Sequence, residues 1–145
     1  KEGKRMEEVV ALAQYVLDHS RFLFTPETLE YLKKGGRIGG AAALFGNLFQ
    51  IKPILTVVDG ETSIFKKVRT RKKAVDEIVG TVLNEIELKG LGDVIVHHIN
   101  CEEEGMKLAK ALENKLGQKV GIQSIGPVIG LHVGPGSIGI AYYTK

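Results

Sequence analysis

The sequence predicts one α/β or α+β domain built on a mixed β-sheet of about six strands with packed helices. Segments whose apolar residues recur at helical spacing alternate with short apolar runs that are typical of strands. Asp59-Gly60 is a hairpin signal, so an antiparallel strand pair is expected among the helical crossovers. The 145 residues, 43% of them hydrophobic, suffice for one domain that buries roughly 70% of the surface of its unfolded chain.

The first third of the chain predicts a helix, a strand and a second helix. Apolar residues recur at helical spacing over about residues 4–19, and residues 21–24 are typical of a short strand. Thr25-Pro26-Glu27 combines a capping hydroxyl, a proline and an acid, which predicts a helix start. Gly35-Gly36 predicts the end of that helix.

The middle of the chain predicts a hairpin and then a long helix. Residues 52–58 and 63–68 are expected to be the two hairpin strands, with Asp59-Gly60 in the turn. Thr70 is expected to cap a helix that continues to about Leu88, because apolar residues recur there at helical spacing.

The last third predicts three strands and at least one helix. Residues 94–99 are expected to form a strand, and Asn100 begins a pattern that resembles a capping box at a helix start. Residues 120–125 and 138–143 are expected to be the last two strands. Between them, residues 127–133 form a short helix or a loop.

The segment 38–49 consists almost entirely of small and apolar residues. One face of the expected helix carries four of them: Ala41, Leu44, Phe45 and Leu48. Such a helix must be buried by protein or by an apolar ligand, and the residues alone favour a core helix. Its glycines disfavour helix by about 1 kcal/mol each, so we expect them to serve close packing.

Several apparent motifs do not support the chemistry that they suggest. Residues 134–139 match G-x-G-x-x-G, but a strand rather than a helix is expected to follow, so a dinucleotide site is rejected. No phosphate-binding P-loop pattern occurs. His97 and His98 are adjacent on a strand and point to opposite faces, so no metal site is predicted. No nucleophile–base pair is evident, so no catalytic residue is predicted.

The net charge of +3 hides a cluster of six basic residues within positions 66–73. Arg71, Lys72 and Lys73 fall in the first turn of the expected helix, where the helix dipole disfavours positive charge. We therefore expect an anionic partner or an acidic neighbour, although an ordinary solvated surface is equally compatible. Nucleic acid is disfavoured because aromatic residues are few and no stacking pattern occurs.

Composition favours a cytoplasmic protein without stable membrane insertion. No apolar run approaches the ~20 residues of a membrane span, and no segment resembles a signal peptide. The single Cys101 fits a reducing compartment and is expected to be a small packed residue. Because the chain starts Lys1-Glu2-Gly3 with a helical pattern already under way by Met6, we expect a domain rather than a whole gene product.

Two glycine-rich motifs carry a family resemblance. They are Tyr-Leu-Lys-Lys-Gly-Gly-Arg-Ile at 31–38 and His-Val-Gly-Pro-Gly at 132–136, each of which places an anion-binding side chain among glycines. With four further blocks in register, they make the whole chain resemble the C-terminal domain of the DegV family of fatty-acid-binding proteins. The further blocks are residues 48–55, 59–60, 67–74 and 125–130.

The resemblance implies a long-chain fatty acid, such as palmitate, held between two α/β domains, of which residues 1–145 are the second. Some bacterial members carry the acyl chain for a fatty acid kinase, a separate enzyme that phosphorylates the carboxylate. The family's N-terminal hydroxyl residues, which hold the carboxylate, have no counterpart here. Gly39 and Val133 depart from a common Ser and Thr. No cofactor or metal is implied.

The resemblance also suggests a site for each part of the ligand. His132, Gly134 and Gly136 are expected near the carboxylate, while Arg37 and Arg69 are expected to contact the kinase or the forming phosphate. The expected acyl-chain pocket consists of Ile38, Ala41, Leu44, Phe45, Leu48 and Ile54. Without the other domain, an apolar patch around Leu44, Phe45 and Leu48 is expected to be exposed. The alternatives are a domain that binds a phosphorylated small molecule at the Arg37, Arg69 and His132 loops and, third, a basic nucleic-acid-binding domain.

Overall fold

The computed structural model, which describes residues 3–44 and 51–145, contains the predicted mixed sheet. Its strands are β1 (Ser20–Thr25), β2 (Lys52–Val58), β3 (Glu61–Val68), β4 (Leu91–His98), β5 (Gly121–Ser124) and β6 (Ile138–Thr144). They are ordered β3-β2-β1-β6-β4-β5. All neighbouring pairs are antiparallel except β4 and β5, which are parallel and connected through a helix. The predicted mixed α/β fold is therefore confirmed.

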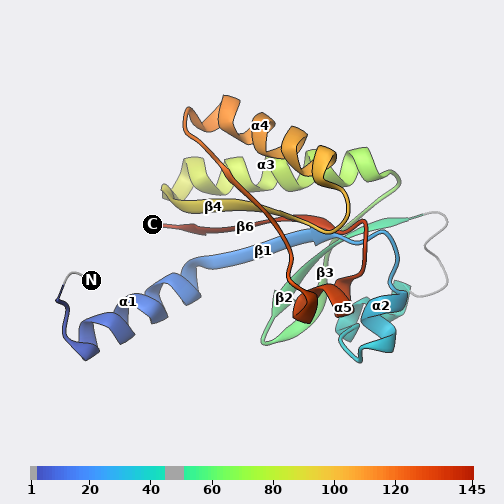
Figure 1. Ribbon diagram of the computed structural model, residues 1–145, viewed down its shortest axis with the longest axis horizontal. Coiled ribbons are helices and arrows are strands. Elements are labelled where there is room, and N and C mark those ends of the chain that lie inside the picture. The colour runs from blue at the N-terminus through green and yellow to red at the C-terminus, as the bar shows by residue number, and fades with distance from the viewer. Residues whose placement is uncertain (1–2, 45–50) are drawn as a thin grey trace.

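The helices divide between the two faces of this sheet. They are α1 (Met6–His19), α2 (Glu30–Lys34), the 3₁₀ helix η1 (Gly39–Leu44), α3 (Arg71–Lys89), α4 (Glu102–Leu116) and α5 (Pro127–Val133). Figure 1 shows α3 and α4 side by side over one face, with α2 and α5 together on the other side. Helix α1 extends away from the sheet, and none of its residues is buried. None of these helices combines the length and apolarity that crossing a membrane requires.

Two apolar cores follow from this division. The larger core lies between the sheet and α3 and α4, and it includes Leu23, Ile54 and Ile140, which are fully buried. The smaller core joins α2, η1 and α5 to the opposite face through Phe24, Leu55 and other residues. Because side chains alternate along a strand, the neighbours Ile54 and Leu55 belong to different cores.

The predicted hairpin is confirmed in its turn and in its strands. Asp59 and Gly60 have φ values of 51° and 80°, and both lie in the left-handed region that a two-residue turn of this kind requires. Val58 and Glu61 pair directly beside the turn. The expected cap of α3 is also present, because the Thr70 side chain accepts a hydrogen bond from the Lys73 amide at 3.2 Å.

The predicted helix start at Thr25-Pro26-Glu27 is wrong. Thr25 is instead the last residue of β1, where it pairs with Ile138 and is fully buried. The helix begins at Glu30, whose amide donates to Thr28 Oγ1 at 3.2 Å. Strand pairing therefore outweighs the local capping signal.

The capping box predicted from Asn100 is also wrong. Helix α4 starts at Glu102. Its N-cap residue is Cys101, whose side chain makes no capping hydrogen bond. Asn100 has a φ of 52° and lies in the turn that leaves β4, so its side chain is one residue too early to cap the helix.

The small-residue segment forms η1 up to Leu44, and its predicted continuation through Phe45 and Leu48 lies outside the described residues. The close-packing role of its glycines is confirmed at Gly39, where a Cβ would lie 2.5 Å from the Thr62 carbonyl oxygen. Leu44 is only 4% exposed. The expectation that Leu44 belongs to an exposed apolar patch is therefore wrong, because it packs in the smaller core.

We expect Gly139→Ala to lower the free energy of unfolding by about 1–3 kcal/mol, the usual range for overpacking. A Cβ at Gly139 in β6 would lie 2.6 Å from both the Leu23 carbonyl oxygen and the Phe24 Cβ of the central neighbour β1. Urea denaturation measures the change.

Gly80→Ala provides the matched control. Nothing lies within 4 Å of the Cβ position at Gly80, which is exposed in the middle of α3. This change should raise stability by about 0.5–1 kcal/mol, because alanine favours helix. Equal effects of the two substitutions would contradict the close packing of β6 on β1.

Candidate functional site

The two glycine-rich motifs, a hundred residues apart in sequence, pack against each other. A Cβ at Gly35, the residue that ends α2, would lie 2.1 Å from Nδ1 of His132 in the last turn of α5. The ring of Tyr31 occupies the equivalent space beside Gly134, where a Cβ would lie 2.3 Å from it. Glycine at both positions thus lets α2 and α5 approach closely, and the packing positions the imidazole of His132.

No hydrogen bond fixes the inner side of the His132 ring. Its Nδ1 atom is buried and has no hydrogen-bond partner among the described residues. An unsatisfied buried polar atom costs roughly 1–3 kcal/mol, so its presence requires an explanation. The ring is held in place by its packing against Gly35 at the α2–α5 junction rather than by a hydrogen bond.

Hydrogen bonds fasten the loop after His132 to the turn between β4 and α4. The amide of Gly136 donates to the Ile99 carbonyl at 2.7 Å, and the Ile99 amide donates to the Ser137 carbonyl at 3.0 Å. The Ser137 hydroxyl donates to the Val133 carbonyl at 2.7 Å and closes the loop on itself. This glycine-rich loop connects α5 to β6, so the prediction that a strand rather than a helix follows it is confirmed.

Arg71 has the acidic neighbours that the sequence led us to expect. Its guanidinium contacts both carboxylate oxygens of Glu104 at 2.8–3.0 Å and one oxygen of Glu27 at 3.4 Å. Burial favours the neutral form, but the hydrogen bond and charge of Glu104 outweigh it, and the pKa of Arg71 is raised. The rest of the basic cluster is more open, and Arg69, Lys72 and Lys73 are exposed and make no ion pair with described residues.

The structure does not bring Arg37 or Arg69 into contact with His132. Arg37 is exposed in the loop after α2, where its side chain donates to the Gly35 carbonyl at 3.5 Å. Arg69 is exposed at the end of β3, beside a hollow of about 670 Å³ that Lys67 and Ile51 also line. Both arginines therefore lie at the surface.

The residues expected to line an acyl-chain pocket do not form one group. Ala41 and Leu44 are buried in the smaller core, and Ile38 packs against it. Ile54 instead lies on the other face of the sheet, fully buried in the core beneath α3, because β2 directs it there. Phe45 and Leu48 lie outside the described residues.

An apolar hollow of about 240 Å³ lies where α5 meets the open face of the sheet. Its lining residues are Phe22, His97, Gln123, Ser124, Ile125, Gly126, Ile129 and Ala141. The rings of Phe22 and His97 meet edge to face, with centroids 6.2 Å apart. For His97 the sequence predicted only that it does not form a metal site with His98. Its alternation with the buried residues Val94, Val96 and His98 was the available signal that it faces the opposite side.

Burial lowers the pKa of His97, and the neighbouring His98 adds to that effect, whereas a hydrogen bond with the backbone of Gln123 opposes it. The neutral imidazole is therefore favoured beside Phe22, which suits an apolar surface. The neutral imidazole and the apolar residues Phe22, Ile129 and Ala141 make the hollow compatible with a hydrocarbon ligand.

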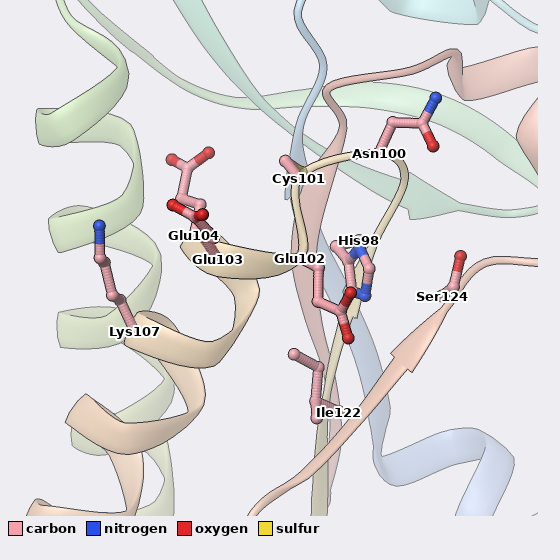
Figure 2. Close-up of a pocket in the computed structure, with 9 residues that line it drawn as sticks. All are labelled: His98, Asn100, Cys101, Glu102, Glu103, Glu104, Lys107, Ile122 and Ser124. Atoms are coloured by element: carbon pink, nitrogen blue, oxygen red, sulfur yellow. The ribbon is translucent and has the colours of Figure 1, made fainter.

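A wider and more polar hollow of about 810 Å³ lies at the start of α4 (Figure 2). Figure 2 shows Glu102 beside His98 and Ile122, while Glu103 and Glu104 lie on the other side of the helix start. Glu104 is engaged by Arg71, and the described residues contain no group of His, Cys, Asp and Glu that could hold a metal ion. The acidic residues here are explained by their place in the first turn of α4, where the helix dipole favours negative charge.

The fold and the α2–α5 junction define an α/β domain with an open apolar sheet face beside two glycine-rich loops. The chain belongs to the DegV family, because the family model, which describes an uncharacterised protein family, matches residues 1–145.

A DegV domain-containing protein of Clostridium acetobutylicum is 57% identical over 144 residues, which are 99% of this chain and 50% of that protein. A DegV family protein of Streptococcus agalactiae, described as fatty acid binding, has a TM-score of 0.87 at 28% identity over 99% of this chain and 51% of its own. A stearic acid-binding protein of Eubacterium ventriosum has a TM-score of 0.85 at 27% identity, over 99% of this chain and 51% of its own. The chain thus spans about half the length of the relatives that it matches.

We expect the protein to lose stability as the pH falls below the ordinary histidine pKa of about 6.5. The unfolded chain then binds a proton at His97 that the folded chain resists, because its pKa is lowered in the folded state. The stability is present above about pH 6.5 and is lost as the pH falls toward the folded-state pKa. Urea denaturation at pH 7.5 and 5.5 should show a smaller loss for His97→Gln than for the parent.

The control is His19→Gln, which changes an exposed histidine at the end of α1. This variant should keep the parental pH dependence because it retains His97. If His97→Gln also kept the parental pH dependence of stability, the titration of His97 would not explain the acid sensitivity.

Proposed function

We propose that this chain forms one wall of a binding site for a long-chain fatty acid such as palmitate. The observation that carries the proposal is the apolar hollow under α5, with His132 one helical turn from the lining residue Ile129. Residues three apart on a helix share a face, so an acyl chain in the hollow can direct its carboxylate toward His132, Gly134 and Gly136. The fatty-acid-binding relatives from S. agalactiae and E. ventriosum support this ligand class.

We infer that the chain is the C-terminal domain of a two-domain protein that acts in the bacterial cytoplasm. The matched relatives are about twice as long, which supports a second domain. The open sheet face and the exposed apolar residues of α1, among them Met6, Val10 and Leu17, offer the surface on which such a domain can pack. The ligand then lies between the two walls.

The proposed acyl-chain surface combines expected and newly identified residues. Phe22, Ile125, Ile129 and Ala141 line it in the hollow. Ile38, Phe45 and Leu48 remain proposed as its continuation. Ala41 and Leu44, buried in the smaller core, and Ile54, beneath α3, are left out. Transfer of a 16-carbon chain from water to such a surface gains on the order of 12 kcal/mol, at ~0.8 kcal/mol per methylene, so few polar contacts are needed.

We further propose that the protein is not itself an enzyme and needs no cofactor, and that it presents the carboxylate to a separate fatty acid kinase. The exposed arginines Arg37 and Arg69 suit contacts with the kinase or with the phosphate that forms. A guanidinium binds phosphate oxygens in a fork that an ammonium group cannot reproduce. Both side chains are exposed, and Arg37 lies in the first glycine-rich motif, which favours this docking role over a closed site for a phosphorylated small molecule.

Ala141→Phe in the full-length protein should reduce palmitate affinity at least roughly tenfold, because the larger ring fills the hollow beside Phe22. His132→Ala should weaken binding as well, through loss of a hydrogen-bond donor to the carboxylate. Mass spectrometry of extracted lipid identifies the ligand, and calorimetry measures its affinity.

Ala111→Phe, at an exposed position of α4, makes the same change away from the hollow and should leave palmitate affinity unaltered. The proposed function would be wrong if the purified full-length protein carried no fatty acid and bound no palmitate. Equal affinity for Ala141→Phe and the parent would remove the hollow from the site.

Arg37→Lys and Arg69→Lys should leave palmitate affinity nearly intact and slow acyl-phosphate formation by the kinase several-fold. Lys89→Arg, at the far end of α3, is the control and should change neither the palmitate affinity nor the rate of acyl-phosphate formation. Acyl-phosphate formation is followed in single-turnover assays with the full-length protein. Parental rates for both arginine variants would return these residues to ordinary surface.

A further inference from the structure

One guanidinium joins three segments that are distant in sequence and that meet at the His132 loop. Arg71, at the start of α3, contacts Glu27 between β1 and α2, Glu104 in α4, and the carbonyl of Gly136. We propose that Arg71 is a positioning residue for the carboxylate site, which holds the loop of residues 132–137 in the geometry that ligand binding requires. This inference rests on the proposed fatty-acid function.

The hydrogen bond to Gly136 is short, and Glu104 holds the guanidinium that donates it. Nη2 of Arg71 donates to the Gly136 carbonyl at 2.5 Å and to Glu104 at 2.8 Å, while Nε donates to both oxygens of Glu104 at 3.0 Å. Glu104 thus orients the guanidinium plane, and the plane directs one N–H at the loop. Side-chain exposure is only 22% for Arg71 and 36% for Glu104, so water screens this pair less than an open surface pair.

The loop transmits this constraint to His132. Gly136 is held from its other side as well, because its amide donates to the Ile99 carbonyl. The next residue, Ser137, donates from its hydroxyl to the carbonyl of Val133, the neighbour of His132. A displacement of Gly136 therefore moves Ser137 and, through its hydrogen bond to Val133, the last turn of α5 that carries His132.

Arg71 also connects this loop to the segment that leads into the other motif. Glu27 contacts Arg71 and Lys52, at 3.4 and 3.1 Å, and precedes α2, which ends at the Gly35 contact with His132. The imidazole is thus bounded by two segments, and Arg71 touches both of them. Among the described residues, other ion pairs such as Arg21–Glu85 make no such contact with the loop backbone.

The location of Arg71 argues against a purely local stabilising role. A cation in the first turn of a helix opposes the helix dipole, which costs stability unless acidic groups offset it. An arginine there is explained by the fork geometry, because a lysine cannot reach Glu104, Glu27 and Gly136 along three directions at once.

The test compares two ligands of equal chain length in the full-length protein. Palmitate has a carboxylate and 1-hexadecanol does not, so a positioning role lowers the affinity for palmitate selectively. We expect Arg71→Lys to lower the affinity for palmitate roughly tenfold, which corresponds to about one charge-assisted hydrogen bond. The affinity for hexadecanol should stay nearly unchanged. The imidazole NMR signals of His132 should shift in the unliganded variant.

Arg21→Lys, the same change in an ion pair away from the loop, should alter neither ligand's affinity nor the His132 signals. If Arg71→Lys does not fold, Glu104→Gln replaces it, because this change loosens the guanidinium without removing it, and the same selective loss is expected. An unchanged ratio of the two affinities, whether both are retained or both are lost, would overturn the positioning role. Failure of the parent to bind palmitate would instead overturn the proposed function.

Discussion

In the described part of the chain, the long helices α3 and α4 cover one face of the six-stranded sheet and leave much of the other open, and this asymmetry determines what each apolar strand residue does. Leu23 and Val96 point toward α3 and α4 and are fully buried, whereas their neighbours Phe22 and His97 point to the open side and are half-buried. Burial in the larger core and lining of the apolar hollow beside α5 thus fall to alternate residues of the same strands. Under the proposed function, the covered face keeps the fold intact while the open face contacts the ligand.

Sequence periodicity predicted most of the fold because the helices are amphipathic and the strands are short and apolar. It failed at Thr25 and Asn100, where a local capping signal competed with strand pairing or with the exact start of a helix. The meeting of the two glycine-rich motifs agrees with the family resemblance. Nothing in the local sequence determines which strand face is open, so the place of Ile54 in the core beneath α3 could not be predicted from it.

The basic cluster divides into two parts with different uses. Arg71 turns inward and is satisfied by carboxylates and a carbonyl, whereas Arg69, Lys72 and Lys73 remain in solvent. The unfavourable placement of positive charge at the start of α3 was visible in the sequence, and it correctly indicated an acidic neighbour. The identity of that neighbour was not visible, because Glu104 lies 33 residues away and reaches Arg71 only through the packing of α4 on α3.

The central position of β6 has a consequence for how the chain acquires its fold. Residues 138–143 pair with residues 20–25 on one side and with β4 on the other, so a central strand of the sheet is synthesised after the strands on both sides of it. Contacts of such long sequence separation form slowly. Until β6 arrives, β1 and β4 present unpaired edges, which are prone to associate with other chains. A nascent chain therefore depends on shielding of β1 and β4 until β6 has left the ribosome.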